Sequence, residues 1–280
     1  MPRAAVLGSP IAHSLSPRLH QAAYRVLGLT WEYSAIECDE VGFPGIFAEL
    51  SEEWMGLSLT MPLKEVVFEV VDDVDDLAAA VGSANTVYRL DAIAGNPWRA
   101  TNTDILGMVR ALGDTGVHSL SSATILGAGA TARSALAACA TLGASNVAVH
   151  ARRAEAREEM IGLGVRLGVD VRGFDLDPVG VTTDLLVSTL PADIGAPWAS
   201  APVGEATALL DVSYHPWPTP LAQRWQEQRP DTGLASGRDM LIWQAVAQVG
   251  WMTGAFDPRL QETDPLPLKV VQAMRAALDN

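Results

Sequence analysis

Short apolar runs typical of strands alternate with amphipathic stretches typical of helices along most of this chain. The strand candidates are residues 4–7, 31–37, 55–60, 84–90, 123–126, 147–150, 185–189 and 208–212. The helix candidates are residues 16–27, a short segment around 47–50, and residues 105–112, 133–142, 240–253 and 270–278. Such alternation favours parallel sheets whose strands are joined by right-handed helical crossovers. The sequence therefore predicts an α/β fold.

The alternating pattern changes near Thr101-Asn102-Thr103-Asp104, and a new series of strands and helices begins at Ala123. A chain of 280 residues is long enough for two medium-sized domains. We expect two α/β domains, residues 1–104 and residues 105–236. Residues 237–280 should form C-terminal helices that return to the first domain.

Composition excludes several classes of function. The formal net charge of −14 argues against nucleic acid and anionic membranes as partners. No uncharged apolar run reaches the length of a membrane span, and the apolar stretch at the N-terminus is too short for a signal peptide. Cys38 and Cys139 form neither a metal-ligand spacing nor a disulfide framework. We expect a cytoplasmic protein without a metal site.

A glycine-containing turn follows the strand predicted at 123–126 and opens the next helix. It comprises Gly127, Ala128, Gly129, Ala130, Thr131 and Ala132. Glycine permits a sharp turn and a close approach of the backbone, and the free amides at a helix N-terminus attract a pyrophosphate. The alternative is an ordinary tight connection between strand and helix. The position of the turn favours a Rossmann-type dinucleotide-binding domain.

The end of the next strand indicates which dinucleotide is bound. NAD sites usually carry an acidic residue there, which holds the ribose 2′-hydroxyl. This chain instead has His150-Ala151 followed by Arg152 and Arg153. Two arginines suit a 2′-phosphate, so the pattern favours NADP over NAD. The alternative is that both arginines only balance nearby glutamates.

Lys64 is one of only two lysines in the chain, the other being Lys269. This rarity argues against a role only as a charge that keeps the protein soluble. Lysine can gain and lose a proton in a protein, whereas arginine cannot. Its position after a strand and Pro62 makes Lys64 a candidate acid/base group. The alternative is a solvated charge at the start of a helix.

Four polar clusters of the first domain fall at predicted strand ends. They are residues 13–16, then Ser58 with Thr60 and Lys64, then 85–86, then 102–104. Together they offer hydroxyl and amide groups, one cation and one carboxylate, which suits a small polyhydroxylated carboxylic acid. Each also has a structural interpretation: Ser16 and Asp104 as helix N-caps, and Asn85 as a turn residue.

The ordered motifs of the chain resemble the shikimate dehydrogenase family. They are GSPIAHSLSPRLH, LTMPLK, GSANTV, TNTD-x-x-G, GAGATAR, DVSYHPWPTPL and G-x-x-ML-x-x-Q. The resemblance runs from about residue 7 to residue 253.

The resemblance implies a role for each matching residue. Lys64 and Asp104 match the catalytic pair. Residues 1–104 would be the substrate-binding catalytic domain and residues 105–236 the NADP-binding domain. Substrate would be held by Ser14 and Ser16 at its carboxylate, and around its ring by Thr60, Asn85, Tyr214 and Gln244. NADP would be held by Gly127, Ala128, Gly129, Ala130, Thr131, Arg133, Arg152, Arg153, Thr189 and Met240.

The implied reaction is the reversible, NADP-dependent reduction of 3-dehydroshikimate to shikimate in aromatic amino-acid biosynthesis, by a monomer or homodimer. Alternatives are a quinate/shikimate dehydrogenase that uses NAD, a non-catalytic nucleotide-binding paralogue, and a dehydrogenase for an analogue. The chain departs from the family pattern at Ser58, where many members have asparagine, and at Asp239, which replaces a frequent glycine. Its arginine after the second nucleotide strand is also shifted by one position.

Overall fold

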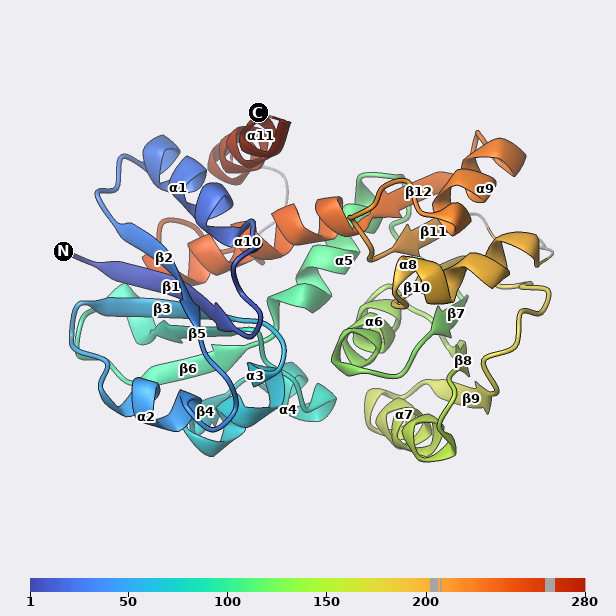
Figure 1. Ribbon diagram of the computed structural model, residues 1–280, viewed down its shortest axis with the longest axis horizontal. Coiled ribbons are helices and arrows are strands. Elements are labelled where there is room, and N and C mark those ends of the chain that lie inside the picture. The colour runs from blue at the N-terminus through green and yellow to red at the C-terminus, as the bar shows by residue number, and fades with distance from the viewer. Residues whose placement is uncertain (202–205, 207, 260–264, 280) are drawn as a thin grey trace. The chain divides into compact units, whose positions relative to one another are not determined.

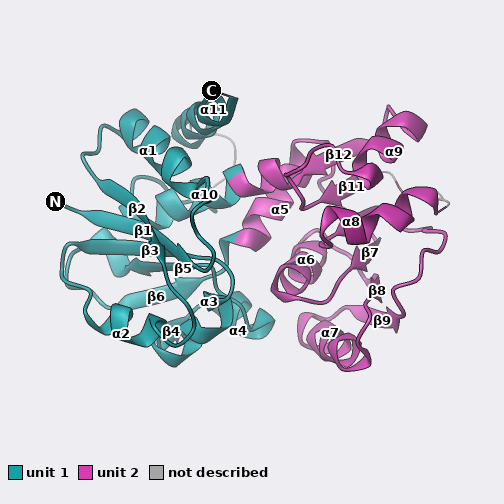
Figure 2. Ribbon diagram, in the orientation of Figure 1, with its two compact units in different colours: residues 1–103, 242–280 teal, residues 104–241 magenta. Residues whose placement is uncertain are grey.

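The computed structural model describes residues 1–201, 206, 208–259 and 265–279 (Figure 1). They form two compact units, one of residues 1–103 with 242–280 and the other of residues 104–241 (Figure 2). The first unit is therefore built from two separate parts of the chain. The expectation of two α/β domains is confirmed. The expected divisions at 104/105 and 236/237 compare with observed divisions at 103/104 and 241/242, the latter inside helix α10 (Gly237–Thr253).

The first unit contains a six-stranded sheet in the order β2-β1-β3-β5-β6-β4. Its strands are β1 (Arg3–Gly8), β2 (Glu32–Glu37), β3 (Trp54–Leu59), β4 (Asp73–Val74), β5 (Thr86–Arg89) and β6 (Trp98–Thr101). Its helices are α1 (Ser16–Leu27), α2 (Phe43–Ala48), α3 (Leu63–Val66), α4 (Asp76–Val81), α11 (Pro265–Asp279) and most of α10, with short 3₁₀ turns at Val67–Glu69 and Leu90–Ala92. Helices α1, α10 and α11 lie on one side of the sheet, and α2 and α4 on the other (Figure 1).

The expectation of purely parallel sheets is wrong for this unit. Strand β1 is parallel to β2 and β3, but β5 is antiparallel to both of its neighbours, β3 and β6. Strands β5 and β6 follow each other after a short connection, and such a connection can join only antiparallel strands.

The core of the first unit lies between the sheet and its covering helices. Strands β1, β3 and β5 bury Leu7, Leu57 and Val87, against which Phe43 of α2 and Leu63 of α3 pack. On the opposite face α10 approaches the sheet closely, because a Cβ atom on Gly56 would lie 2.3 Å from Met252 Cγ. Glycine at 56 thus allows α10 to rest directly on β3.

The second unit contains a fully parallel six-stranded sheet in the order β12-β11-β10-β7-β8-β9. Its strands are β7 (Ser122–Leu126), β8 (Asn146–His150), β9 (Asp170–Phe174), β10 (Leu185–Ser188), β11 (Ala208–Asp211) and β12 (Gly233–Ser236). Its helices are α5 (Thr103–Gly113), α6 (Ala130–Thr141), α7 (Ala154–Leu167), α8 (Ala192–Gly195) and α9 (Pro220–Gln228), with a 3₁₀ turn at Ala196–Ser200. Read from β9, this is the doubly wound strand order of dinucleotide-binding domains.

Two helix starts differ from their simplest interpretation in the sequence. The N-cap of α1 is Leu15, without a side-chain cap, while Ser16 is the first helical residue and is buried. Helix α5 begins at Thr103, so Asp104 lies within its first turn. Neither Ser16 nor Asp104 is therefore an N-cap, and both residues are buried.

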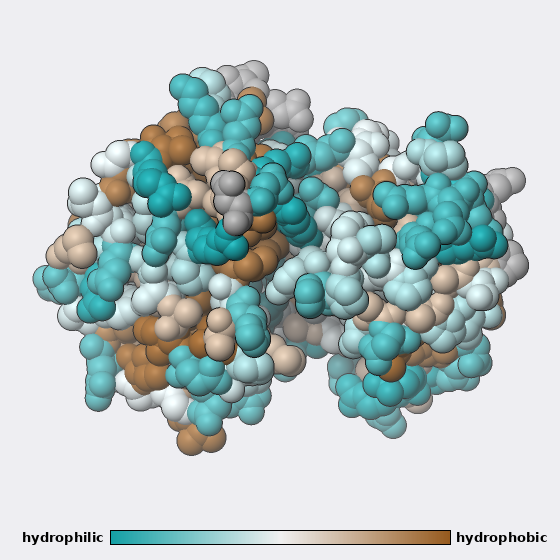
Figure 3. Space-filling model, turned by 45° about the horizontal axis from the view of Figure 1, so that its top comes forward, coloured by the Kyte–Doolittle hydropathy of each residue, from teal (hydrophilic) through white to brown (hydrophobic). Residues whose placement is uncertain are grey.

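In the view of Figure 3, hydrophobic residues form patches separated by hydrophilic ones. Among the described residues, no helix is long and apolar enough to cross a membrane. The same part of the chain contains no cluster of three or more side chains suited to holding a metal ion.

Candidate active site

The second unit has a topological switch point between β7 and β10. From there the strand order runs outward to one edge through β8 and β9, and to the other edge through β11 and β12. The two strands pair in register through Leu126 and Ser188, so the residues that follow, Gly127 and Thr189, meet at their carboxyl ends. The Thr189 amide and hydroxyl both donate to the Leu126 carbonyl, at 2.9 and 2.8 Å. Ligands of doubly wound sheets bind in the crevice at this kind of edge.

The glycine turn has the backbone geometry that a phosphate-binding turn requires. Gly127 has φ of 108°, a region that disfavours residues with a side chain, and its amide donates to the His150 carbonyl at 2.9 Å. Gly129 is the N-cap of α6, and a Cβ atom there would meet nothing within 4 Å. The protein therefore leaves open space beside Gly129, at the N-terminus of α6. These amides have no partner within the helix and can receive an anion.

Ala132, at the third glycine position of the fingerprint, is completely buried in the first turns of α6. A small residue is needed there because α6 packs on β7. Alanine meets this requirement.

Two exposed arginines follow the second strand of the nucleotide fold, as the sequence predicts. Arg152 and Arg153 lie between β8 and α7, and within the described residues neither guanidinium forms an ion pair. The alternative that they balance the glutamates of α7 has no ion pair to support it. Both cations are instead accessible to a ligand.

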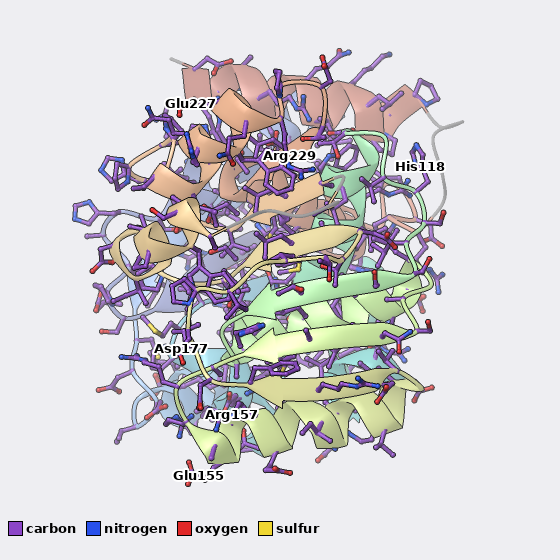
Figure 4. The ribbon with its side chains drawn as sticks, turned by 90° about the vertical axis from the view of Figure 1, so that its right-hand side faces the viewer. His118, Glu155, Arg157, Asp177, Glu227 and Arg229 are labelled. Atoms are coloured by element: carbon purple, nitrogen blue, oxygen red, sulfur yellow. The ribbon has the colours of Figure 1, made fainter. Side chains whose placement is uncertain are left out.

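Arg157 is a relevant residue that the sequence reading missed. It lies near the start of α7, at the edge of the second unit shown in Figure 4. Its Nη1 donates to the Ala151 carbonyl and to Asp175 Oδ1, both at 2.6 Å. This cation braces the segment that carries Arg152 and Arg153. The sequence analysis did not predict helix α7, so it gave no indication that Arg157 lies near the end of β8.

His150 supplies no charge to this region. Its ring is buried between Phe174, stacked at 5.2 Å, and Trp198, edge-on at 5.0 Å, and Nδ1 lies 3.0 Å from the Asp175 carbonyl. Burial lowers the pKa of His150 below its usual 6.5, so the ring is neutral near pH 7. Positive charge at the end of β8 therefore comes from the arginines.

In the first unit, Asn85 and Gln244 form the centre of a buried polar cluster. Asn85 Oδ1 accepts from the Thr103 amide at 2.8 Å, from the Thr103 hydroxyl at 3.0 Å and from the Thr86 hydroxyl at 2.8 Å. Its Nδ2 donates to Gln244 Oε1 at 3.3 Å. The structure thus brings together two of the residues predicted to contact substrate and shows Asn85 presenting its amide hydrogens.

The backbone of Lys64 is bonded to the segment that precedes Asn85 and β5. The Ala84 amide donates to the Lys64 carbonyl at 2.9 Å, and the Leu63 amide donates to the Thr60 carbonyl at 2.8 Å. Lys64 is half-buried in α3, directly after the carboxyl end of β3. The cation, Thr60 and Asn85 therefore belong to one connected region.

Ser14 and Ser16 lie at the same edge of this sheet as Thr60. They follow β1, which is parallel to β3, and the loops after the two strands are joined by a 3.0 Å bond from the Ser9 amide to the Met61 carbonyl. The Ser16 amide donates to Ser14 Oγ at 3.3 Å, so the two serines form one local turn. The sequence prediction that these clusters approach each other at a sheet edge agrees with this arrangement.

Two of the three departures from the family pattern have structural explanations. Ser58 is buried in β3, where its hydroxyl donates to Gln248 Oε1 at 2.9 Å and accepts from the Tyr33 hydroxyl at 2.7 Å. Its single donor is thus used inside the protein. Asp239 forms a capping box with Ser236 at the start of α10: Asp239 Oδ2 accepts from the Ser236 amide, and the Asp239 amide donates to Ser236 Oγ.

Asp104, Met240 and Tyr214 are among the predicted site residues that belong to the second unit. Asp104 is buried in the first turn of α5, Met240 is buried near the start of α10, and Tyr214 is largely exposed after β11. Lys64 belongs to the first unit. The pairing of Lys64 with Asp104, the position of Tyr214 near the substrate and the position of Met240 beside the nicotinamide therefore remain predictions.

The first unit also has a pocket of about 670 Å³ at the C-terminal end of α10. Its walls include Tyr88 stacked on Trp251 at 5.4 Å, and Arg259, which pairs with Asp257 at 2.7 Å. Of the four polar clusters, one residue, Asn102, is among the residues that line this pocket. Neither Lys64 nor Asn85 is among them.

The fold and the two polar regions define a class of protein, the two-domain dinucleotide-dependent dehydrogenases. Comparison with known proteins identifies the family. Residues 6–87 match the model of the shikimate dehydrogenase substrate binding domain. A shikimate dehydrogenase (NADP(+)) of Exiguobacterium is 34% identical over 260 residues, which cover 89% of this chain and 92% of that protein. The chain belongs to the shikimate dehydrogenase family.

Solved structures agree with this membership. A shikimate 5-dehydrogenase from Mycobacterium fortuitum superposes with a TM-score of 0.84 at 40% identity, covering 99% of this chain and 97% of that one. The Thermus thermophilus enzyme, solved in complex with NADP(H) and shikimate, has a TM-score of 0.77 at 28% identity, covering 99% of this chain and all of that one.

Proposed function

We propose that this protein catalyses the reversible reduction of 3-dehydroshikimate to shikimate with NADPH. The observation that carries the proposal is family membership over nearly the whole chain, together with a donor set that suits both ligands. The second unit has an open amide-lined turn at Gly129 and two accessible arginines, which suit a pyrophosphate and a 2′-phosphate. The first unit has the hydroxyl, amide and ammonium groups that a hydroxylated acid requires.

The residues of the second unit would hold the cofactor. The turn from Gly127 to Thr131, with Arg133 and Thr189, would receive the pyrophosphate, while Arg152 and Arg153 would bind the 2′-phosphate. Met240 would lie beside the nicotinamide. When bound, NADP supplies or accepts the hydride, and the protein provides the orientation.

The residues of the first unit would bind substrate and move the proton. Ser14 and Ser16 would bind the carboxylate, while Thr60, Asn85 and Gln244 would hold ring hydroxyls, with Tyr214 nearby. Lys64 would give its proton to the carbonyl oxygen during reduction and take it back during oxidation. Asp104 would hydrogen-bond the same oxygen and orient Lys64.

We place the reaction in the cytoplasm. Cys38 and Cys139 are both free and buried, which suits a reducing compartment. This proposal is tested by fractionating the source cells and following the activity.

The function is tested by steady-state assays that cross shikimate and quinate with NADP and NAD. We expect turnover of shikimate with NADP to exceed the other three combinations by at least roughly tenfold in kcat/KM, the effect of one lost charge-assisted contact. Preference for quinate with NAD would identify the broader dehydrogenase instead. Nucleotide binding without turnover of either acid would identify a non-catalytic paralogue.

A further inference from the structure

A continuous hydrogen-bond network lies behind the candidate substrate site, and Gln248 is at its centre. Gln248 is on α10, one turn after Gln244, and is almost fully buried. Its Oε1 lies 2.9 Å from Ser58 Oγ and 3.2 Å from His20 Nε2, and its Nε2 lies 3.2 Å from the Asn85 carbonyl and 3.1 Å from Thr86 Oγ1. All four partners are buried.

The donors and acceptors around Gln248 leave a single consistent assignment. A backbone carbonyl can only accept, so the Gln248 group that faces the Asn85 carbonyl must be the amide NH₂. The opposite atom is then the carbonyl oxygen, which accepts from Ser58 and His20. Burial holds His20 neutral by lowering its pKa to about 3, so one ring nitrogen carries the hydrogen that Gln248 accepts.

The same assignment extends to Asn85. Thr86 Oγ1 receives a hydrogen from Gln248. Its own hydrogen has two acceptors within reach, Asn85 Oδ1 at 2.8 Å and Thr103 Oγ1 at 3.1 Å, of which Asn85 Oδ1 is the nearer. Asn85 Oδ1 also faces the Thr103 amide, which can only donate. Asn85 Oδ1 thus faces donors, so the NH₂ of Asn85 must point the other way, toward Gln244 Oε1.

We propose that Gln248 is a positioning residue that, through Thr86 and the backbone of Asn85, holds the Asn85 amide with its NH₂ group toward the substrate. Gln248 would act through these partners, because its side chain is buried and its amide bonds protein groups. Ser58, Tyr33 and His20 hold Gln248 from the other side: the Tyr33 hydroxyl donates to Ser58, and the His20 ring stacks on Tyr33 at 3.9 Å. The serine at 58 therefore serves Gln248 rather than the ligand.

This inference rests on the proposed function for its kinetic test but not for its structural one. The structural test follows the side-chain amide of Asn85 by ¹H–¹⁵N NMR in the free protein, with the signal identified by its loss in Asn85→Ala. The native protein should give one sharp pair of signals. In Gln248→Met the pair should broaden, split or shift, whereas in Gln272→Met, a change at an exposed position in α11 of the same unit, it should not. An unchanged Asn85 pair in a folded Gln248→Met protein would overturn the proposal.

The kinetic test is a double-mutant cycle between positions 248 and 85. Gln248→Met should raise KM for shikimate roughly 3- to 10-fold, the fold-change of about one lost hydrogen bond, and leave KM for NADP unchanged. In the Asn85→Ala background the same substitution should have almost no further effect on KM. A role confined to packing would give the same rise in both backgrounds and would contradict the proposal.

Thr86→Val provides a second variant in case Gln248→Met does not fold. It removes the hydroxyl that joins Gln248 to Asn85 while keeping nearly the same volume. It should reproduce both the NMR change and the rise in KM. If the native protein neither binds nor turns over shikimate, the proposed function fails, and the NMR comparison still decides the role of Gln248.

Discussion

Gly127 and Thr189 lie in direct contact just after the carboxyl ends of the neighbouring strands β7 and β10. A Cβ atom on Gly127 would lie 2.3 Å from Thr189 Oγ1, the hydroxyl that closes onto the Leu126 carbonyl. The threonine hydroxyl thus fills the volume that any other residue at 127 would need. Gly129, two residues later, has open space in place of a neighbour.

The two glycines should therefore fail differently when each is changed to alanine. Gly127→Ala forces a side chain into a positive φ and against Thr189, so we expect a loss of about 1–3 kcal/mol in the free energy of unfolding. Gly129→Ala has an ordinary φ and should keep its stability, but its methyl group enters the space proposed for the pyrophosphate. Urea denaturation and the KM for NADP measure both effects. Normal NADP affinity in Gly129→Ala would place the cofactor elsewhere.

Lys64→Ala should lower kcat by roughly 10²- to 10⁴-fold, the usual contribution of a positioned proton-transfer group. Binding of shikimate should weaken much less, because the amide and hydroxyl groups remain. The other lysine of the chain, the exposed Lys269, provides the matched control, and Lys269→Ala should retain full activity. A kcat near normal in Lys64→Ala would refute its assignment as acid and base.

The double variant Arg152→Ala/Arg153→Ala should raise KM for NADP far more than KM for NAD. The reason is that only NADP carries the 2′-phosphate, and each charge-assisted contact is worth about 1.5–3 kcal/mol when well formed and less when exposed. Arg172→Ala, which removes an exposed arginine on β9, is the control and should change neither constant. Equal rises for the two cofactors would mean that the pair does not read the 2′-phosphate.

Buried His20 should make stability depend on pH. Its pKa is lowered from 6.5 to about 3, chiefly because burial disfavours the charged ring. The unfolded chain therefore binds a proton below pH 6.5 that the folded protein refuses until about pH 3. Stability is fully present above pH 6.5 and should fall by up to about 1.4 kcal/mol per pH unit between these limits.

Urea denaturation at pH 7, 6 and 5 tests this dependence. His20→Gln should flatten the slope by about one proton, while His118→Gln, at an exposed position, should leave it unchanged. His150 contributes to the slope that remains, because burial lowers its pKa as well. An identical slope in the native and His20→Gln proteins would show that folding does not lower the pKa of His20.

The parts of the fold that follow from local signals were predictable. An apolar run predicts the strand at Ala123–Leu126, and the glycines predict the sharp turn and the helix that follows it. Strands β6, β9 and β12 and helices α7 and α9 were missed, because strands such as β9 carry charged or glycine residues and gain their stability from partners distant in the sequence. The antiparallel setting of β5 was missed because β6, which follows it after a short connection, was missed.

The candidate site shows a similar division. The residue types that could act on substrate were visible in the motifs around Lys64 and Asn85, since their chemistry is carried by single side chains. The sequence did not show which hydrogen bonds these groups form with other residues of the protein. The uses of Ser58 and Asp239 depend on Gln248 and Ser236, partners that only the folded chain identifies.

The discontinuous make-up of the first unit affects the order in which the protein can fold during synthesis. The second unit is a single uninterrupted segment, residues 104–241, whereas the first needs α10 against β3 and α11 against α1. As the chain leaves the ribosome, the nucleotide-fold segment is complete before the first-made strands obtain their covering helices. The first unit therefore begins to be synthesised before the second but is completed after it. Until α10 and α11 are made, the part of its sheet that they cover stays exposed, and a chaperone would have to protect this surface.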